Sequence, residues 1–508
     1  MSDRLERMIG ESLGARRDEP CYWWDGAWNT GADFLRLAEE CERTLEAAGF
    51  GPGQRLVAMM KNCPMIPALS LAVWRLGGAF CPLNVAAGMD SLLGTLDLIE
   101  PFAVVMSDEV RAGVEDALKA RGWSCVVCPP EGPLPPFKGR LATPEAEDLA
   151  VIFATSGTTG NPKAVPLTHA NLIDQCLKLP QFVTPLASGD VFLNVLPNFH
   201  SFGYTVTVLL PLTMGGRLAI VSGFLPPQPA MRAIVEAPVN VIFAVPAIMS
   251  YLLAAVERGK FPREALARQK FLITGGDRLN PALHEQALHL VGLDIMEGYG
   301  LTETSPVVAV NRNYETHRTG TVGPFLPGYE YKLRGRDGKD VEGNEGVLWV
   351  RGPSVSRGYF RAPEVTAERF EFDEGGSWFN TGDYVRLEEG AGDGPCVRIL
   401  DRVTDILIVG GFNVYPQEVE KVLSEHPDVQ TAIVVGMPHP VNGEIPKAFI
   451  QRREGAELTE RELIKFAKER LAHFKAPRSV EFVDEFPLSG TGKILRRVLR
   501  ERAGKRGL

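Results

Sequence analysis

The stretch TSGTTGNPK, residues 155–163, concentrates hydroxyl, glycine and lysine residues directly after the apolar run VIFA. A glycine-rich turn after a buried strand lets backbone N–H groups converge on one anion, and hydroxyls and a lysine add donors and charge. The stretch therefore indicates a phosphate-binding loop, although a polar surface turn explains it equally well when it is considered alone. The Walker pattern requires a glycine where Pro162 stands, so a P-loop NTPase is excluded. The candidate phosphate-binding residues are Thr155, Ser156, Gly157, Thr158, Thr159, Gly160 and Lys163.

The segment EGYGLTET, residues 297–304, carries three groups suited to a nucleotide. Tyr299 offers an aromatic face for a base, and the hydroxyl of Thr302 can contact a phosphate oxygen. The carboxylate of Glu303 suits Mg²⁺, which prefers oxygen ligands and substrate phosphates. A plain turn does not require all three groups.

Two later loops carry one ionisable group each. The stretch NTGD places Asp383 after a glycine turn, where its carboxylate can accept hydrogen bonds from two ribose hydroxyls. The stretch PLSGTGK presents Lys493 on a glycine-rich loop. Taken singly, each of these stretches is explained as well by an ordinary loop as by a binding site.

The composition indicates a multidomain globular protein. The chain has 508 residues, of which 45% are hydrophobic and 23% charged, and its net charge is −9. This length suggests three or four folding units, and the acidic balance argues against a nucleic-acid-binding protein, which needs a basic face. The eight cysteines include one CxxC pair, Cys125 and Cys128, with no second pair or nearby histidine to complete a zinc site. We therefore expect buried thiols and a reducing, cytoplasmic location.

No segment predicts a membrane span or a secretory signal. The longest apolar stretch, around residues 204–215, contains Pro211 and is shorter than the roughly 18 residues that a spanning helix requires. The N-terminal region is polar, with apolar residues at helical spacing, which favours a surface helix over a helix lying on a membrane.

Helical patterns at residues 30–48, 64–76 and 89–99 alternate with short apolar runs in the first 150 residues. This rhythm predicts a layered α/β domain with a largely parallel sheet. After about residue 320 short glycine-bounded strands predict a smaller, twisted β subdomain that extends to about residue 400.

The last hundred residues predict a small α+β domain. Pro416 begins a helical pattern, and Thr459 and Glu462 form a capping box before another. We place the boundary so that residues 1–401 form the N-terminal domain and residues 402–508 form a C-terminal lid domain.

Five stretches occur in a diagnostic order: TSGTTGNPK, GYGLTET, FNTGD, LDRVTDILIVGGFNVYPQEVE and PLSGTGK. In this order they resemble the motifs of the adenylate-forming superfamily, which includes acyl-CoA synthetases, peptide-synthetase adenylation domains and luciferases. The likeness covers essentially the whole chain. It implies an α/β fold with layered α/β subdomains, a twisted β subdomain and a small mobile C-terminal α+β domain. It also implies an AMP-forming acid–thiol ligase that uses ATP, Mg²⁺ and CoA.

The resemblance assigns roles in adenylation. The loop from Thr155 to Lys163 would close on the β- and γ-phosphates of ATP. Thr302 would contact the α-phosphate and Glu303 would hold Mg²⁺, while Lys493 would bridge the substrate carboxylate and the α-phosphate. The residues implied to bind the adenine and ribose are Gly275, Gly276, Asp277, Tyr299, Gly300, Asp383 and Arg402.

The resemblance also implies a domain rotation that removes the Lys493 loop and opens a pantetheine tunnel beside Gly410 and Gly411. Two glycines suit a site where a thin acceptor arm passes close to the backbone. Two positions depart from the family pattern. Thr404 replaces the usual Asp or Lys at the hinge, and Val347 replaces a usual Glu.

The segment LPNFHSFG favours a fatty acid as the substrate. It lacks the carboxylate that binds an amino-acid ammonium in the family, so an α-amino acid is disfavoured. His200 matches the residue that shields the carboxylate pocket, with a core histidine as the alternative. Phe202, Tyr204 and Phe243 would line the acyl and CoA side of the site. An apolar lining favours a medium or long acyl chain, because each buried CH₂ contributes about 0.8 kcal/mol.

Several alternatives remain open. An acyl carrier protein could replace CoA as the acceptor, and the basic residues after Lys493 could meet either acceptor or form an ordinary solvated helix. The chain could pass acyl-AMP to a dedicated pathway such as lactone formation, or it could be a nucleotide-binding regulator without catalysis. The sequence leaves the acyl chain length, the oligomeric state and contact with a membrane surface open.

Overall fold

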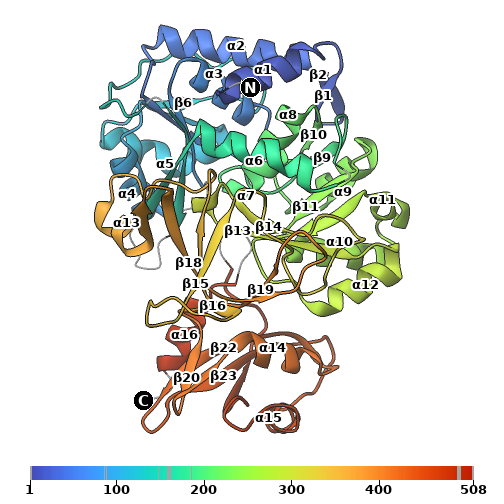
Figure 1. Cartoon of the computed structure of the whole chain (residues 1–508). Coiled ribbons are helices and arrows are strands. Elements are labelled where there is room, and N and C mark those ends of the chain that lie inside the picture. Colours follow the sequence, from blue (N-terminus) through green and yellow to red (C-terminus); the bar gives the residue numbers. More distant parts are fainter. Residues whose placement is uncertain are drawn as a thin grey trace. The chain divides into compact units, whose positions relative to one another are not determined.

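The computed structural model describes residues 3–84, 86, 88–146, 148–156, 162–184, 186–488 and 494–505 (Figure 1). The chain forms two compact units. The first unit comprises Met1–Tyr331, Val350–Asn380 and Glu389–Val397, and the second comprises Lys332–Trp349, Thr381–Glu388 and Arg398–Leu508.

The larger sheet of the first unit has eight strands among the described residues, in the order β14-β13-β12-β11-β9-β10-β1-β2. Adjacent strands from β13 to β1 are parallel, and the edge strands β14 and β2 are antiparallel to their neighbours. In chain order the strands are β1 (Pro20–Trp24), β2 (Ala27–Thr30), β9 (Val191–Asn194), β10 (Arg217–Ile220), β11 (Val241–Ala244), β12 (Phe271–Thr274), β13 (Ile295–Gly300) and β14 (Val307–Val310).

The second sheet of this unit has six strands in the described part of the chain, in the order β6-β5-β3-β4-β7-β8. All neighbours are parallel except β7 and β8, which form an antiparallel hairpin. The strands are β3 (Arg55–Met59), β4 (Ala79–Pro82), β5 (Ala103–Met106), β6 (Cys125–Val127), β7 (Leu149–Ser156) and β8 (Pro162–Thr168).

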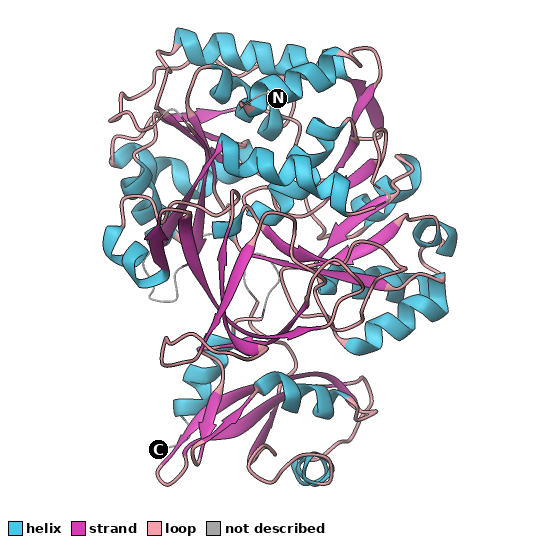
Figure 2. Cartoon of the chain, viewed as in Figure 1, coloured by secondary structure: helices cyan, strands magenta, loops and turns pink. Residues whose placement is uncertain are grey.

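Helices in the first unit connect the strands of both sheets, as Figure 2 shows in cyan. They are α1 (Leu5–Gly14), α2 (Gly31–Ala47), α3 (Met65–Arg75), α4 (Met89–Ile99), α5 (Asp108–Ala120), α6 (His169–Phe182), α7 (Ser201–Tyr204), the π-helical η1 (Thr205–Leu209), α8 (Leu210–Met214), α9 (Gln228–Glu236), α10 (Pro246–Glu257), α11 (Arg263–Ala267), α12 (Pro281–Val291), the 3₁₀ turn η2 (Thr302–Thr304) and α13 (Pro363–Arg369). Helices α2, α3 and α4 confirm the periodicity predicted at 30–48, 64–76 and 89–99.

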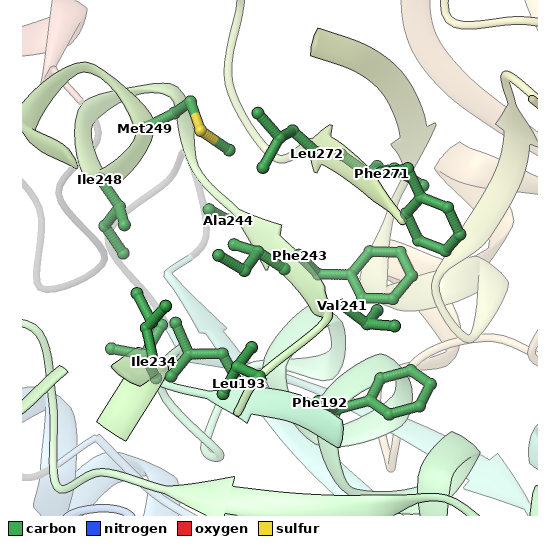
Figure 3. Close-up of a cluster of buried hydrophobic side chains, with 14 of the residues drawn as sticks. Phe192, Leu193, Ile234, Val241, Phe243, Ala244, Ile248, Met249, Phe271 and Leu272 are labelled. Carbon is green, nitrogen blue, oxygen red and sulfur yellow. The ribbon is translucent and has the colours of Figure 1, made fainter. Parts of the chain in front are cut away.

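The core of the larger sheet is apolar on both faces. Strands β9, β11 and β12 are buried along their whole length, which is expected of parallel strands covered by helices on both sides. Figure 3 shows the rings of Phe192, Phe243 and Phe271 following one another across these strands. The rings of Phe192 and Phe243 stack with centroids 6.2 Å apart. This core fixes the ends of β12 and β13, from which the loops of the candidate site leave.

The second unit is built around a sheet in the order β21-β20-β23-β22, with β24 beside β23. Alternate residues of β22 face opposite sides: Val434 packs with helices α14 and α15, whereas Ile433 and Val435 pack with Leu499 of α16. These elements are β20 (Leu407–Val409), β21 (Phe412–Val414), α14 (Pro416–Ser424), β22 (Val429–His439), β23 (Gly443–Arg452), α15 (Glu460–Lys468), β24 (Ser479–Phe482) and α16 (Arg496–Lys505).

The predicted start of α14 at Pro416 is confirmed, as is the capping box of Thr459 and Glu462 at the start of α15. The strands between residues 330 and 402 form one five-stranded sheet in the described part of the chain, as the predicted β subdomain requires, but the two compact units divide these strands between them. The chain passes from one unit to the other within four strands, β15 (Glu330–Arg334), β16 (Glu345–Arg351), β18 (Gly376–Glu388) and β19 (Cys396–Arg402), while β17 (Phe370–Asp373) pairs with the first part of β18. The domain boundary at residue 402 stays a prediction.

Among the described residues, no helix combines the length and the apolarity that crossing a bilayer requires. The apolar stretch around residues 204–215 forms η1 and α8 and lies in the core of the first unit.

Candidate active site

The hairpin of β7 and β8 holds the two ends of the predicted phosphate loop. Thr155 pairs with Lys163, and the Thr155 hydroxyl donates to the carbonyl of Lys163 at 3.4 Å. The predicted residues Gly157, Thr158, Thr159 and Gly160 lie outside the described residues, as does the side chain of Ser156. Antiparallel pairing sets the register at both ends of the loop.

Lys163, Tyr359 and Glu303 form one group in the first unit. The Tyr359 hydroxyl donates to Oε1 of Glu303 at 2.7 Å, and Nζ of Lys163 lies 5.3 Å from the centre of the Tyr359 ring. Burial and then the Glu303 charge raise the pKa of Tyr359, so its phenol stays protonated and keeps donating. We call these three residues the Lys163–Tyr359–Glu303 group.

Backbone hydrogen bonds fix this group. The amide of Ser356 donates to the Glu303 carbonyl at 2.8 Å, and the amide of Phe360 donates to the Ala164 carbonyl at 2.8 Å. The segment around Tyr359 is thereby attached both to η2 and to β8. A carboxylate held in one position by its backbone and by a side-chain donor fits the oxygen ligands that Mg²⁺ takes.

Sequence reasoning missed Tyr359. It lies in the run SRGYF, 56 positions from Glu303, and no local signal there indicates a carboxylate partner. Only the register of the hairpin and the turn at η2 bring the phenol, the ammonium and the carboxylate together.

Thr302 and the segment LPNFHSFG are brought together. Thr302 is buried, and its hydroxyl accepts a hydrogen bond from the Ser201 hydroxyl at 3.3 Å. Ser201 begins α7, between His200 and Phe202. The residue predicted to contact the α-phosphate therefore lies beside the segment predicted to bind the acid.

His200 caps α7. Its Nδ1 accepts from the backbone amide of Phe202 at 3.2 Å, and the side chain is half-buried. This contact places the ring proton of a neutral His200 on Nε2. His200 is thus fixed at the start of the helix, and its predicted role at the carboxylate stays a prediction.

The ring of Phe202 contacts the predicted adenine wall. A Cβ added to Gly275 would lie 3.3 Å from Cζ of Phe202 and 3.1 Å from the carbonyl oxygen of Gly298. The backbone of Gly275, at the end of β12, therefore passes close to both groups. This contact joins the residue predicted for the acyl chain to a residue predicted for the adenine.

Gly300 is required by the packing of β13 against β14. A Cβ at this position would lie 1.8 Å from the carbonyl oxygen of Pro306, so no side chain fits. Tyr299 pairs with Ala309 on the same ladder and is half-buried. Gly276 has a φ of +79°, and the adjacent Asp277 is exposed. The predicted adenine-binding residues thus lie at the ends of β12 and β13.

Tyr204 and Phe243 lie in packed cores. Tyr204 is fully buried, with its ring 6.0 Å from that of Phe80 and 5.9 Å from that of Phe153. Phe243 packs between Phe192 and Phe271, as Figure 3 shows. Both rings are buried, and their acyl role stays a prediction.

In the second unit, Asp383 and Arg402 form an ion pair, with Nε and Oδ1 3.2 Å apart. Asp383 is buried and Arg402 is exposed. The amide of Val403 also donates to the Gly382 carbonyl at 2.9 Å. The two residues predicted to bind the ribose are thus neighbours, and this pairing was not visible in the sequence.

Gly410 and Gly411 form the two-residue turn of the hairpin between β20 and β21. Their φ angles are +57° and +88°, which correspond to a type I′ turn. Among the described residues other than the direct chain neighbours, no atom lies within 3.4 Å of a Cβ added to either glycine. Backbone conformation therefore accounts for both glycines without a close approach of another chain.

Three arginine side chains of α16 pair with carboxylates of the second unit. Arg496 makes a bidentate pair with Glu420 at 2.6 and 2.8 Å, Arg500 contacts Asp405 at 2.7 Å, and Arg502 pairs with Glu481. This pairing favours the interpretation of α16 as an ordinary helix over an acceptor-binding surface. Lys493 lies outside the described residues.

The segment that contains the predicted hinge is attached to α16. Arg500 also donates to the carbonyl of the exposed Thr404 at 3.0 Å. Nearby Asp401 is buried, and its carboxylate accepts from the amides of Arg402 and Gln417. Burial raises the pKa of Asp401 to about 7, with Arg496 acting in the opposite direction.

An open groove of about 870 Å³ lies beside the Lys163–Tyr359–Glu303 group. Its lining residues are Arg357, Tyr359, Arg361, Ala362, Pro363, Thr366, Ala367, Phe370, Glu371 and Phe372. None of the predicted site residues that the structure describes lines this groove. This groove therefore does not mark the predicted nucleotide site.

Comparison with known proteins identifies the family. A family described as AMP-binding enzyme matches residues 11–360, and the AMP-binding enzyme C-terminal domain matches residues 418–493. The chain belongs to the AMP-binding enzyme family. This confirms the resemblance drawn from its motifs, and the likeness to solved structures confirms the predicted fold class.

The relatives differ in the acids that they are named for. A long-chain-fatty-acid–CoA ligase of Yersinia pestis is 36% identical over 71% of this chain, which spans 62% of that ligase. A feruloyl-CoA synthase of an Amycolatopsis species is 31% identical over 94% of both chains. The crystal structure of ATP-bound MatB from Rhodopseudomonas palustris is 29% identical, with a TM-score of 0.89 over 100% of both chains.

Proposed function

We propose that the protein is an AMP-forming acid–thiol ligase. It joins a carboxylic acid to the α-phosphate of ATP, releases pyrophosphate, and transfers the acyl group from AMP to the thiol of CoA. The observation that carries this proposal is the Lys163–Tyr359–Glu303 group, in which Tyr359 contacts both the Glu303 carboxylate and the Lys163 ammonium at the end of the predicted phosphate loop. Family membership and the ATP-bound neighbour support the same reading.

The residues of the group have separate tasks in this proposal. Glu303 holds Mg²⁺, which when bound neutralises phosphate charge. Tyr359 keeps the Glu303 carboxylate in one orientation, and Lys163 contacts the departing β- and γ-phosphates. A reaction between a carboxylate and a phosphate brings two anions together, so fixed cations at this point lower the barrier.

The acid and the thiol use different parts of the chain. Thr302 contacts the α-phosphate, and the segment from His200 to Phe202 binds the acid carboxylate and the start of its chain. The hydrogen bond between Ser201 and Thr302 supports this arrangement, because it joins the two binding segments. A thiol with a pKa near roughly 8.5 supplies enough thiolate to attack acyl-AMP without a dedicated base.

A medium- or long-chain fatty acid is the proposed substrate. Phe202, Phe224 and Val245 are partly buried, and each packs against the large apolar core of the first unit. A long alkyl chain gains about 0.8 kcal/mol for each CH₂ that leaves water, which favours it over acetate in such surroundings. The fatty-acid ligase of Yersinia pestis supports the same class.

An aromatic acid is the second candidate. The feruloyl-CoA synthase matches 94% of both chains, whereas the fatty-acid ligase matches only 62% of its own length. Ferulate and benzoate therefore belong in the same assay as octanoate and hexadecanoate.

The proposal is tested with ATP, Mg²⁺ and this panel of acids, offered CoA or a holo carrier protein, with products identified by mass spectrometry. An acyl thioester on CoA supports the proposed reaction, and relative kcat/KM values choose between alkyl and aromatic acids. A thioester on the carrier alone would indicate that a carrier protein is the acceptor. Acyl-AMP without any thioester would indicate that the protein delivers acyl-AMP to a dedicated pathway. No turnover with any acid indicates a non-catalytic regulator.

We also propose a cytoplasmic location. The structure describes all eight cysteines, and each of them is a free thiol, including Cys125 and Cys128. Thiols persist in reducing compartments, which supports this location. Fractionation of the expressing cells tests it.

A further inference from the structure

A cluster of two histidines and a carboxylate lies away from the nucleotide-binding residues, at the opposite end of β13. His284 is on the buried face of α12, Asp294 directly precedes β13, and His317 lies in the loop that follows β14. One ligand atom from each residue lies within 4.8 Å of the others. Three separate segments of the first unit therefore converge on one point.

The contacts in the cluster are short and directed at Asp294. Nδ1 of His284 lies 2.6 Å from Oδ1 of Asp294, and Nδ1 of His317 lies 3.3 Å from Oδ2 of the same carboxylate. The two imidazole rings are roughly parallel, with centroids 6.0 Å apart. Ligand atoms around a tetrahedral zinc ion are about 3.3 Å apart, given bonds of about 2.0 Å, so small side-chain rotations suffice to admit an ion.

The outer nitrogens of the two imidazoles differ: that of His317 has no hydrogen-bond partner among the described residues, and that of His284 faces a carboxylate. Nε2 of His317 is buried and has no hydrogen-bond partner, and the side chain is only 5% exposed. Nε2 of His284 lies 3.7 Å from Oε1 of Glu297. A metal-binding histidine commonly directs its second nitrogen at a carboxylate, which fixes the ring and increases its basicity.

The backbone around the cluster is fixed in advance. The amide of Ile295 donates to Oδ1 of Asp294 at 2.7 Å, and the side-chain amide of Asn311 bonds the carbonyls of Glu297 and Thr321 at 3.1 and 2.8 Å. These bonds tie the loop that carries His317 to the strand that follows Asp294. Preformed ligands bind a metal more tightly than ligands on mobile loops.

We propose that His284, Asp294 and His317 bind a divalent transition-metal ion of the zinc type, with Glu297 as the outer partner of His284. Two imidazoles and one carboxylate suit zinc and its neighbours, whereas Mg²⁺ and Ca²⁺ prefer oxygen ligands alone. The ion joins α12, β13 and the following loop, and a water completes its four ligands.

The test uses the full chain, stripped with a chelator and titrated with Zn²⁺ in the absence of ATP, so it is independent of ligase activity. We expect one tight site in the wild type. His284→Ala and His317→Ala each remove a direct ligand and weaken binding by at least about 100-fold, the upper end of the effect of losing an outer partner. His289→Ala is the matched control, because His289 is exposed on the same helix.

A conservative variant and a spectroscopic measurement distinguish the loss of a metal ligand from misfolding of a variant. Asp294→Asn keeps an oxygen that accepts from the Ile295 amide, so the fold is preserved while zinc affinity falls. Co²⁺ added to the stripped wild type should give the intense visible bands of a four-coordinate site, and these bands should be lost in Asp294→Asn. The proposal is overturned if the wild type binds no Zn²⁺, or if folded Asp294→Asn and His317→Ala bind it like the His289→Ala control.

Discussion

Tyr359→Phe is the substitution that tests the candidate site most directly. It removes only the hydroxyl that donates to Oε1 of Glu303 at 2.7 Å. The ring remains, and with it the contact to Lys163 at 5.3 Å and the edge-on contact to Phe370 at 5.7 Å. Any change in Mg²⁺ dependence therefore reports the hydrogen bond to the carboxylate and not the packing of the ring.

The magnitude follows from the chemistry of the bond. A hydrogen bond to a charged group contributes about 1.5–3 kcal/mol. At about 1.4 kcal/mol for each factor of ten, its loss corresponds to a roughly 10- to 100-fold weaker interaction between Glu303 and Mg²⁺. We expect the Mg²⁺ concentration for half-maximal pyrophosphate release to rise by that factor. The rate at saturating Mg²⁺ should recover most of its wild-type value.

The assay measures initial rates of pyrophosphate release at saturating ATP and acid while Mg²⁺ is varied. Tyr251→Phe is the control, because Tyr251 is exposed and packs edge-on against Phe224. In a Glu303→Gln background the Tyr359 substitution should add little, since the carboxylate it orients is gone. An unchanged Mg²⁺ dependence in folded Tyr359→Phe would refute the role that we give to the group.

Four further predictions concern single substitutions. Lys493→Ala should lower the rate of pyrophosphate release about 10²–10³-fold, and a normal rate in this variant would count against the catalytic role of Lys493. Lys163→Ala should mainly weaken ATP binding, and a normal affinity for ATP would count against its role at the phosphates. Asp401 has its pKa raised to about 7 in the folded state, so the unfolded state ionises first and stability falls as pH rises from about 4 to about 7. The free energy of unfolding of Asp401→Asn, measured in urea, should therefore rise by about 2–4 kcal/mol relative to that of the wild type as the pH increases from 5 to 8. A difference in stability that does not change with pH would contradict the raised pKa of Asp401. Gly411→Ala should cost about 1 kcal/mol of stability, because of its positive φ, but leave thioester formation intact; a selective loss of the thioester step would support a tunnel instead.

Local patterns in the sequence predicted local structure well. The capping box of Thr459 and Glu462 and the helix that starts at Pro416 depend on residues within one turn of each other. The paired ends of the phosphate loop follow from an apolar strand before the glycines and a second strand after them. Such features need no knowledge of the tertiary fold, which is why a single sequence reveals them.

Long-range partners could not be predicted in the same way. Tyr359 reaches Glu303, and Asp383 meets Arg402, only because strands and turns far apart in sequence set their register. Gly410 and Gly411 show that a local pattern can also suggest a function that local conformation does not require. Their φ angles satisfy a hairpin turn, so a pair of glycines that looks like a close approach is explained by local conformation.

Three carboxylates of the chain illustrate how the partner decides what a carboxylate can do. Glu303 is oriented by a phenol that remains neutral, so its full negative charge is kept for a dication. Asp383 lies beside the guanidinium of Arg402, which offsets its charge and suits it to hydroxyl donors rather than to a metal. Asp294 lies between two imidazoles, whose nitrogens can share it with a softer ion. The chemical group is the same in all three places, and the partner that the fold supplies distinguishes the proposed magnesium ligand, the proposed ribose acceptor and the proposed zinc ligand.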